Sequence, residues 1–400
     1  MVVCDLDRPW LDTPFLLQGF CIKTTGEIET LKKYCKYVYI DASTRSSVVP
    51  GRHAASVPGH ITKTGNSPKP DAVFFTPSEP VYKDSISVKE ELVTAINVHR
   101  DLTARFEELF KSIGSDKTVD IRRLEAPVTQ MVESILRNQD ACLFLTTLKG
   151  INDYSYGHCI NSSILATTFG RYLGLPREDL TILAWGTLLF DIGKVKLPAE
   201  LLKKQSSYTD DEFTIIKKHV EYSAQLIREM KEIPEEAVEI ALTHHERFDG
   251  NGYPLGRKGP AIPAFGRIAG IVDTYDAITN IRPHAQPLSP HDAIKKLYQW
   301  RNTAFMEELI EAFIQCLGIY PIGTLVELTT GQVGIVISQN RTRRLRPKIS
   351  LVLDSRKISY GISPVIDLIR ETEDDNGNPL GIKNVLVPGS YGIDQNKYYL

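Results

Sequence analysis

The stretch HHERFDGNGYP occupies residues 244–254 and follows an apolar, helix-like run that begins at Pro234, a residue suited to the first turn of a helix. It joins two adjacent imidazoles, His244 and His245, to a glycine-rich turn. Adjacent residues of a helix point about 100° apart, so such a pair alone is as often one surface residue and one core residue as two metal ligands. The stretch therefore indicates a metal site beside a substrate loop only if further ligands join it.

Further candidate ligands lie in apolar, helix-like segments on both sides of this stretch. Burial of an isolated charge or imidazole is costly unless the group meets a cation or a partner. One such helix should start at Thr209, which resembles the first residue of a capping box. On that helix His219 shares a face with Ile215, so His219 should point inward. The candidate ligands are His158, Asp191, His219, His244, His245 and Asp273, a mixture that suits iron, manganese or zinc.

Length and composition describe a globular chain with no strong charge bias. The chain has 400 residues and an apolar fraction of 42%, which is enough for about two or three domains. Lysine and arginine number 47 against 49 for aspartate and glutamate, so the net charge gives no argument for DNA, RNA or an anionic membrane as a partner. Neither a signal peptide nor an apolar run long enough to span a membrane is present in the sequence, so we expect a cytoplasmic protein.

The six cysteines are scattered without paired spacing, which favours reduced thiols over disulfides or a zinc ribbon. Cys159 stands beside His158 and is expected to be a small core residue.

Changes in the pattern along the chain predict a mainly α protein, in which a helical bundle is flanked by a small α/β module and a small β appendage. Residues 1–82 should form the N-terminal module, a strand, helix and strand over 13–43 followed by a flexible linker. Residues 83–117 should form an amphipathic connecting helix, which serves signalling or dimerisation or simply packs on its own domain.

Residues 118–317 have the pattern of an almost continuous series of helices. After Leu317 the apolar period changes to two, which predicts a β appendage and tail over 318–400. Three strands are expected there, at 325–328, 333–337 and 349–353, with a turn at Thr330-Gly331.

In order and approximate spacing, the candidate ligands together with Lys194 and the Gly252-Tyr253-Pro254 turn resemble the motifs of the HD-GYP family. The resemblance is specific over about 125–285. In addition, Asp7-Arg8-Pro9-Trp10 and Tyr39-Ile40-Asp41 are similar to a small domain of unknown function that often precedes HD-GYP domains. The resemblance implies an HD-type helical bundle that holds two or three iron or manganese ions. It also implies hydrolysis of cyclic di-GMP, a bacterial messenger, to a linear dinucleotide or to GMP.

The resemblance also implies a role for each ligand. Asp191 would bridge two divalent metal ions, which can then lie about 3.5 to 4 Å apart, lower the pKa of a shared water and clamp the phosphoryl oxygens. One metal would be bound by His158 and Asp273, and the other by His219, His244 and His245.

Three further elements would contact the substrate. Lys194 would neutralise a phosphate or assist the leaving oxygen, although a lysine taken alone is more often a solvated charge. Gly252, Tyr253 and Pro254 would form the substrate loop, with the tyrosine ring against a guanine or phosphate. Arg282 would contact a phosphate, for which the bidentate geometry of its guanidinium is suited.

Three departures from the family pattern weaken this expectation. Phe190 replaces the histidine of the His-Asp pair, so one ligand is missing from one metal, and either water fills its place or the phenyl ring keeps that space dry. Tyr154 stands where members with three metals carry a glutamate, so we expect at most two metals. His284 and Ala285 replace the aromatic and basic residues that commonly follow Arg282-Pro283, which removes one phosphate contact.

Three functions stay open at this stage. A working cyclic di-GMP phosphodiesterase with a weakened two-metal site is favoured by the six ligands, Lys194 and the intact turn. A degenerate domain that binds the nucleotide or a partner protein without turnover is favoured by Phe190 and Ala285. An HD-type phosphohydrolase for another nucleotide is disfavoured by the intact Gly-Tyr-Pro turn. The resemblance further suggests a diguanylate cyclase as a partner, and a homodimer is a further expectation.

Overall fold

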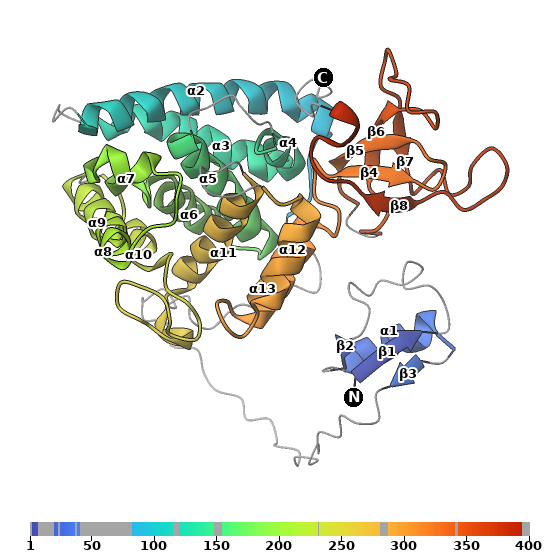
Figure 1. Cartoon of the computed structure of the whole chain (residues 1–400), viewed down its shortest axis with the longest axis horizontal. Helices are drawn as coiled ribbons and strands as arrows, with labels where there is room; N and C mark the ends of the chain where they lie inside the picture. The colour runs from blue at the N-terminus through green and yellow to red at the C-terminus, as the bar shows by residue number, and fades with distance from the viewer. Residues whose placement is uncertain are drawn as a thin grey trace, which may run out of the picture. The chain divides into compact units, whose positions relative to one another are not determined.

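The structure is a computed structural model, which describes residues 2–6, 20–22, 25–36, 38–40, 82–114, 120–147, 154–230, 232–280, 287–340 and 343–393. The chain divides into two units, one made of residues 1–69 with 342–345 and the other of residues 70–341 with 346–400. Both units are drawn in Figure 1.

The described residues of the N-terminal unit form a three-stranded antiparallel sheet and one helix. The sheet has the order β2 (Phe20–Cys21), β1 (Val2–Leu6), β3 (Val38–Ile40), and α1 spans Thr25–Tyr34. Leu31 and Cys35 lie one helical turn apart and are buried together. The helix and the last strand were expected, and β2 lies within the first expected strand. Strand β1 was not expected, because a five-residue run interrupted by an aspartate has only a weak periodicity.

The larger unit is a helical bundle with a small sheet, which confirms the expected mainly α class (Figure 1). Twelve α-helices of this unit lie in the described residues: α2 (Val88–Gly114), α3 (Glu125–Arg137), α4 (Gln139–Leu145), α5 (Tyr154–Tyr172), α6 (Arg177–Leu189), α7 (Ala199–Lys203), α8 (Asp210–Lys217), α9 (His219–Glu229), α10 (Glu235–Thr243), α11 (Ala264–Thr279), α12 (Pro290–Gln299) and α13 (Glu307–Leu317). Among the described helices, none is long and apolar enough to cross a bilayer.

Helices α5 and α6 form the centre of the bundle because they are apolar on several sides. Glycines let their neighbours approach closely. A Cβ on Gly170 of α5 would lie 2.7 Å from Leu180, and one on Gly186 of α6 would lie 2.3 Å from Ile240 of α10. Substitution of either glycine would therefore push apart the helices that carry the candidate ligands.

Helix α2 extends along one side of the bundle and is tied to it by a buried carboxylate. Glu91 accepts hydrogen bonds of 2.7 Å from the Arg137 guanidinium and from Ser134 Oγ on α3. The carboxylate is buried, so removal of Arg137 would leave an uncompensated charge, and removal of Ser134 would cost one hydrogen bond.

Two helices follow Thr209, where the sequence predicted one. The capping box is present, with Thr209 accepting from the Glu212 amide and Glu212 accepting from the Thr209 amide. The helix then ends at Lys217, and a second one begins at His219. His219 is buried as expected, but Ile215, which lies on α8 and not on α9, remains 38% exposed.

The C-terminal part forms a five-stranded antiparallel sheet of order β7, β6, β5, β4, β8. The three expected strands are β4 (Leu325–Leu328), β5 (Val333–Ser338) and β6 (Lys348–Leu353). Strands β7 (Val365–Asp367) and β8 (Ile382–Val385) were missed, because they are short and lack a regular alternation of buried and exposed residues.

The two faces of this sheet have separate roles. Val333 and Ile335 join the core of the helical bundle, whereas Val336 and Ile349 belong to a second apolar cluster on the sheet itself. The appendage is thus packed against the bundle through one face. The three segment boundaries expected from the sequence, at 82, 117 and 317, stay a prediction.

Candidate metal centre

The six candidate ligands converge from five elements of the bundle. His158 lies on α5, Asp191 follows α6, His219 begins α9, the histidine pair follows α10, and Asp273 lies on α11. They form two groups, and within each group the ligand atoms lie within 4.8 Å of one another. One group is Asp191, His219, His244 and His245, and the other is His158, Asp191 and Asp273. Asp191 belongs to both groups.

Short connections and small residues position these side chains. Asp191 precedes the 3-10 helix η4 (Ile192–Lys196), which packs directly on the first turn of α9. A Cβ on Gly193 would lie 2.4 Å from the carbonyl oxygen of His219, so only glycine allows this approach. The amide of Gly193 also donates to Ser223 Oγ at 2.8 Å. These contacts bring the carboxylate of Asp191 beside the ring of His219.

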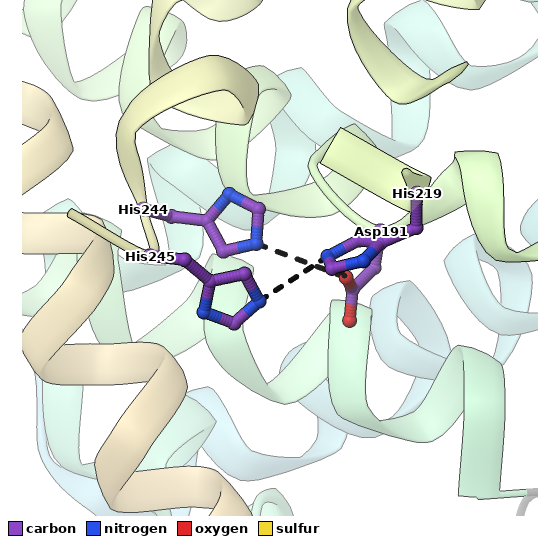
Figure 2. A group of neighbouring side chains, drawn as sticks. All are labelled: Asp191, His219, His244 and His245. Atoms are coloured by element: carbon purple, nitrogen blue, oxygen red, sulfur yellow. Dashed lines mark hydrogen bonds and ion pairs between the residues drawn. The ribbon is translucent and has the colours of Figure 1, made fainter. Parts of the chain in front are cut away.

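Pro234 precedes α10 as its N-cap residue, and the helix ends at Thr243. The histidine pair therefore stands just beyond the helix end. Figure 2 shows His244 and His245 pointing from this end toward Asp191 and His219.

Hydrogen bonds at the outer nitrogens determine which ring nitrogens face the centre. His219 Nδ1 lies 2.7 Å from the carbonyl oxygen of Ile216, and His244 Nδ1 lies 2.7 Å from that of Ala241. Both Nδ1 atoms must donate, because a carbonyl oxygen only accepts. In the neutral rings each Nε2 therefore presents a lone pair to the centre.

These lone pairs meet other electron-rich atoms. His219 Nε2 is 3.2 Å from Asp191 Oδ1 and 3.2 Å from His245 Nε2, and His244 Nε2 is 3.8 Å from Asp191 Oδ1 (Figure 2). Asp191 Oδ1 and His244 Nε2 are buried and have no hydrogen-bond partner among the described residues. Buried polar atoms normally have a partner. A divalent cation among these atoms would supply it, so the donor set fits a metal.

The protonation states of His244, His245 and Asp191 are those that metal binding requires. Burial lowers the pKa of His244 to about 4 and holds the pKa of His245 well below its usual value, so both rings are neutral near pH 7. Burial alone would raise the pKa of Asp191, but the ammonium of Lys194 and the ring of His219 hold that pKa well below its usual range. Neutral imidazoles and an ionised carboxylate are the forms that bind metals.

The second group is organised around His158. Its Nε2 lies 3.1 Å from Asp273 Oδ1 and 3.5 Å from Asp191 Oδ2, and its Nδ1 lies 2.7 Å from Asp276 Oδ2. Burial alone would lower the pKa of His158, but its hydrogen bonds to Asp273 and Asp276 raise that pKa to about 9. A positive charge is therefore favoured among these carboxylates. A metal at Nε2 would supply it and leave the Nδ1 hydrogen bond to Asp276 intact.

Asp276 is a residue that the sequence reasoning missed. It stands three residues after Asp273 on α11, on the same helix face. Its carboxylate also accepts a hydrogen bond of 2.7 Å from Asn280 Nδ2. That spacing was the available signal, since carboxylates commonly orient a metal-binding histidine through its second nitrogen.

Phe190 lies between histidines of the two groups. Its side chain is 0% exposed, and its ring centroid is 4.6 Å from that of His244 and 5.7 Å from that of His158. A phenyl ring has no lone pair to donate. The second group thus keeps three protein residues, and apolar carbon packs beside both groups.

The structure describes only some of the other site residues that the sequence predicted. The ammonium of Lys194 contacts Asp191 Oδ2 and is partly exposed. The side chain of Tyr154 and residues Arg282, His284 and Ala285 lie outside the described residues. Cys159 is buried in the core, as expected.

The Gly252-Tyr253-Pro254 turn packs against the metal-ligand groups. The ring centroid of Tyr253 lies 4.6 Å from that of His245. A Cβ on Gly252 would lie 2.3 Å from the amide nitrogen of Arg247, so the close approach requires glycine. The peptide bond between Tyr253 and Pro254 is cis.

Glu246 holds this turn in place and was also missed. Its buried carboxylate accepts hydrogen bonds from the amides of Leu255, at 2.8 Å, and Arg257, at 2.9 Å. An acidic residue between the histidine pair and the glycine-rich turn was the only signal in the sequence. Its partners are backbone amides, which carry no sequence signature.

Comparisons with known proteins match two family models to the chain. A family model for the HD domain matches residues 130–306, and a model for a domain of unknown function, DUF3391, matches residues 1–124 and so extends through α2. A cyclic di-GMP phosphodiesterase from Pseudomonas aeruginosa is 29% identical over 380 residues, covering 94% of this chain and 88% of the relative.

Two further relatives are similar over the HD domain. A cyclic di-GMP phosphodiesterase from Thermotoga maritima is 34% identical over 152 residues, covering 38% of this chain and 41% of the relative. A 3'3'-cGAMP-specific phosphodiesterase from Vibrio cholerae is 33% identical over 159 residues, covering 40% of this chain and 30% of the relative. The chain thus carries an HD domain with a DUF3391 domain ahead of it, and it is similar over most of its length to a relative named as a cyclic di-GMP phosphodiesterase.

Proposed function

We propose that this chain is a metal-dependent phosphodiesterase that hydrolyses cyclic di-GMP to a linear dinucleotide or to GMP. The observation that carries the proposal is the ionised, buried Asp191, which belongs to both groups of ligand atoms. The substrate is supported by the Pseudomonas aeruginosa relative, which is named for this activity and is similar to the chain over 94% of its length.

Two divalent cations fit the donor set, with iron or manganese as the expected metals. Asp191 would bridge them, His158 and Asp273 would complete one site, and His219, His244 and His245 would complete the other. The donors are imidazole nitrogens and carboxylate oxygens without thiolate, which suits these metals. Bound metals would polarise the phosphoryl oxygens and lower the pKa of a water molecule.

The chain's own residues would bind and orient the diester. Lys194 contacts Asp191 at the edge of the centre, where its ammonium can neutralise a phosphate oxygen or the leaving oxygen. Tyr253, whose ring packs on His245, would contact a guanine, and Gly252 lets the turn lie close to the ligands. Arg282 would contact a phosphate.

Phe190 favours a second candidate, a degenerate domain that binds cyclic di-GMP or a partner protein without turnover. The residue adds no ligand, and its buried ring packs against His158 and His244. A site that retains only three protein residues can still hold a metal, because water can complete the coordination of iron or manganese. The six remaining ligands make the enzyme the better proposal.

The test is metal content and turnover in one preparation. The chain is purified without oxygen, iron and manganese are counted per chain, and cyclic di-GMP conversion is followed for the wild type, Asp191→Ala and Phe190→His. Wild-type turnover that disappears in Asp191→Ala rejects the degenerate domain. Nucleotide binding without product in the wild type, with product only in Phe190→His, rejects the enzyme. Cyclic GMP-AMP as a second substrate tests specificity.

The proposal includes a cytoplasmic location, because cyclic di-GMP is a messenger inside bacteria. A diguanylate cyclase is the proposed protein partner, since it makes the substrate that this chain would remove. A homodimer is proposed as the assembly, and light scattering after size-exclusion chromatography would test it.

A further inference from the structure

A line of aromatic rings leads from the metal-ligand groups to α8. The ring of Tyr253 lies 4.6 Å from that of His245, and the ring of Phe213 lies 6.0 Å from that of Tyr253 at an interplanar angle of 83°. Phe213 remains 42% exposed, although it is a large apolar side chain. An exposed aromatic ring at the edge of a candidate active site is suited to contact a ligand.

A lysine shares this surface. Lys217 follows Phe213 by four residues, which places both side chains on one face of α8. Its Nζ lies 5.1 Å from the ring centroid of Phe213 and 5.9 Å from that of Tyr253. Cation–π attraction holds an ammonium in such a position. The surface therefore offers two aromatic rings and one positive charge together.

The break between α8 and α9 puts this surface next to the metal ligands. Helix α8 ends at Lys217, and α9 begins at the ligand His219, only two residues later. The capping box at Thr209 and the contact between Lys204 and Glu212 fix the other end of α8. The short helix thus has a defined position and presents Phe213 and Lys217 beside the substrate loop.

We propose that Phe213, Lys217 and Tyr253 form one recognition surface for the nucleotide. The inference rests on the proposed function and deepens it. A cyclic dinucleotide has two phosphates and two bases, and only one phosphate can lie at the metal centre. The rings of Phe213 and Tyr253 take a guanine by stacking or edge contact. The ammonium of Lys217 pairs with the phosphate that is not cleaved.

Two measurements test the surface. Binding of cyclic di-GMP is measured by calorimetry on protein treated with a chelator, in which no turnover occurs, and KM and kcat are measured on the metal-loaded protein. The variants are Phe213→Ala, Phe213→Tyr, Lys217→Met and the matched control Lys218→Met. The control removes the same charge from the neighbouring, exposed lysine.

Phe213→Ala and Lys217→Met should each weaken binding or raise KM by about tenfold, the loss expected for one base–aromatic stack or one phosphate contact. Their kcat should stay within about twofold of wild type, because the contacts lie away from the scissile bond. Phe213→Tyr keeps a ring and should bind like wild type, as should Lys218→Met. The salt dependence of binding should fall in Lys217→Met and not in Lys218→Met.

Two outcomes separate the inference from the proposed function. A wild type that neither binds nor cleaves cyclic di-GMP overturns the proposed function. A wild type that binds or cleaves it, with Phe213→Ala and Lys217→Met both matching Lys218→Met in affinity and KM, overturns the recognition surface alone. Melting curves of each variant confirm that it is folded, and the comparison of Lys217→Met with Lys218→Met keeps the test decisive if Phe213→Ala does not fold.

Discussion

Replacement of Phe190 by histidine tests whether the phenyl ring occupies the place of a metal ligand. The ring is fully buried, 4.6 Å from the ring of His244 and 5.7 Å from that of His158. An imidazole is slightly smaller than a phenyl ring and would fit the same space. It would bring a nitrogen lone pair next to histidines of both ligand groups.

The expected change in the free energy of unfolding follows from the burial of the ring and from the coupling between metal binding and folding. Without metal, Phe190→His loses about 1.5 to 3 kcal/mol of apolar burial and costs about 1 to 3 kcal/mol for an unpaired buried imidazole. The free energy of unfolding should therefore fall by roughly 2.5 to 6 kcal/mol. With metal present, each tenfold gain in metal affinity returns about 1.4 kcal/mol to the folded state.

The assay is urea denaturation without oxygen, once with a chelator and once with saturating manganese. Phe190→His should be less stable than wild type with the chelator and should gain at least about 1.4 kcal/mol more than wild type from manganese. Phe190→Leu is the control, since it keeps an apolar side chain and adds no ligand. An equal response to manganese in the histidine and leucine variants would refute the reasoning, because the ring would then lie outside the ligand positions.

Three further substitutions test the residues that support the site. Glu246→Ala removes the acceptor of the Leu255 amide, so hydrogen exchange at this amide should accelerate about tenfold or more, and unchanged exchange would contradict its role. Asp276→Asn should weaken metal binding about 10- to 100-fold by removing the anionic partner of His158, which metal titration with a fluorescent competitor would measure; full affinity would contradict it. Gly252→Ala should raise KM by displacing the substrate loop, whereas steady-state kinetics identical to wild type would show that the loop accepts a Cβ.

The sequence named the six candidate ligands, which the structure brings together, but it did not predict how they are arranged. Order and spacing pointed to His158 and Asp273, which are 115 residues apart and yet lie 3.1 Å apart at their ligand atoms. Only the packing of α5 against α11 brings them together. The same packing pairs His158 with Asp276. The residue types in the sequence do not by themselves indicate this contact.

Helix starts were predicted better than helix ends. The capping box at Thr209 is a local interaction, so the sequence contains all of it. The end of α8 at Lys217 depends on how α9 packs on η4 through Gly193 and Ser223, which is a tertiary effect. For that reason the exposure of Phe213 and the position of Lys217 beside it, and with them the recognition surface, were not foreseen.

Metal content measured together with turnover tests the central claim most directly. Protein purified without oxygen should contain about two iron or manganese ions per chain and should convert cyclic di-GMP, whereas Asp191→Ala should lose both the metal and the activity, because it removes the carboxylate shared by the two groups. A wild type that binds no transition metal under these conditions, or an Asp191→Ala variant that keeps its full metal content, would contradict the account.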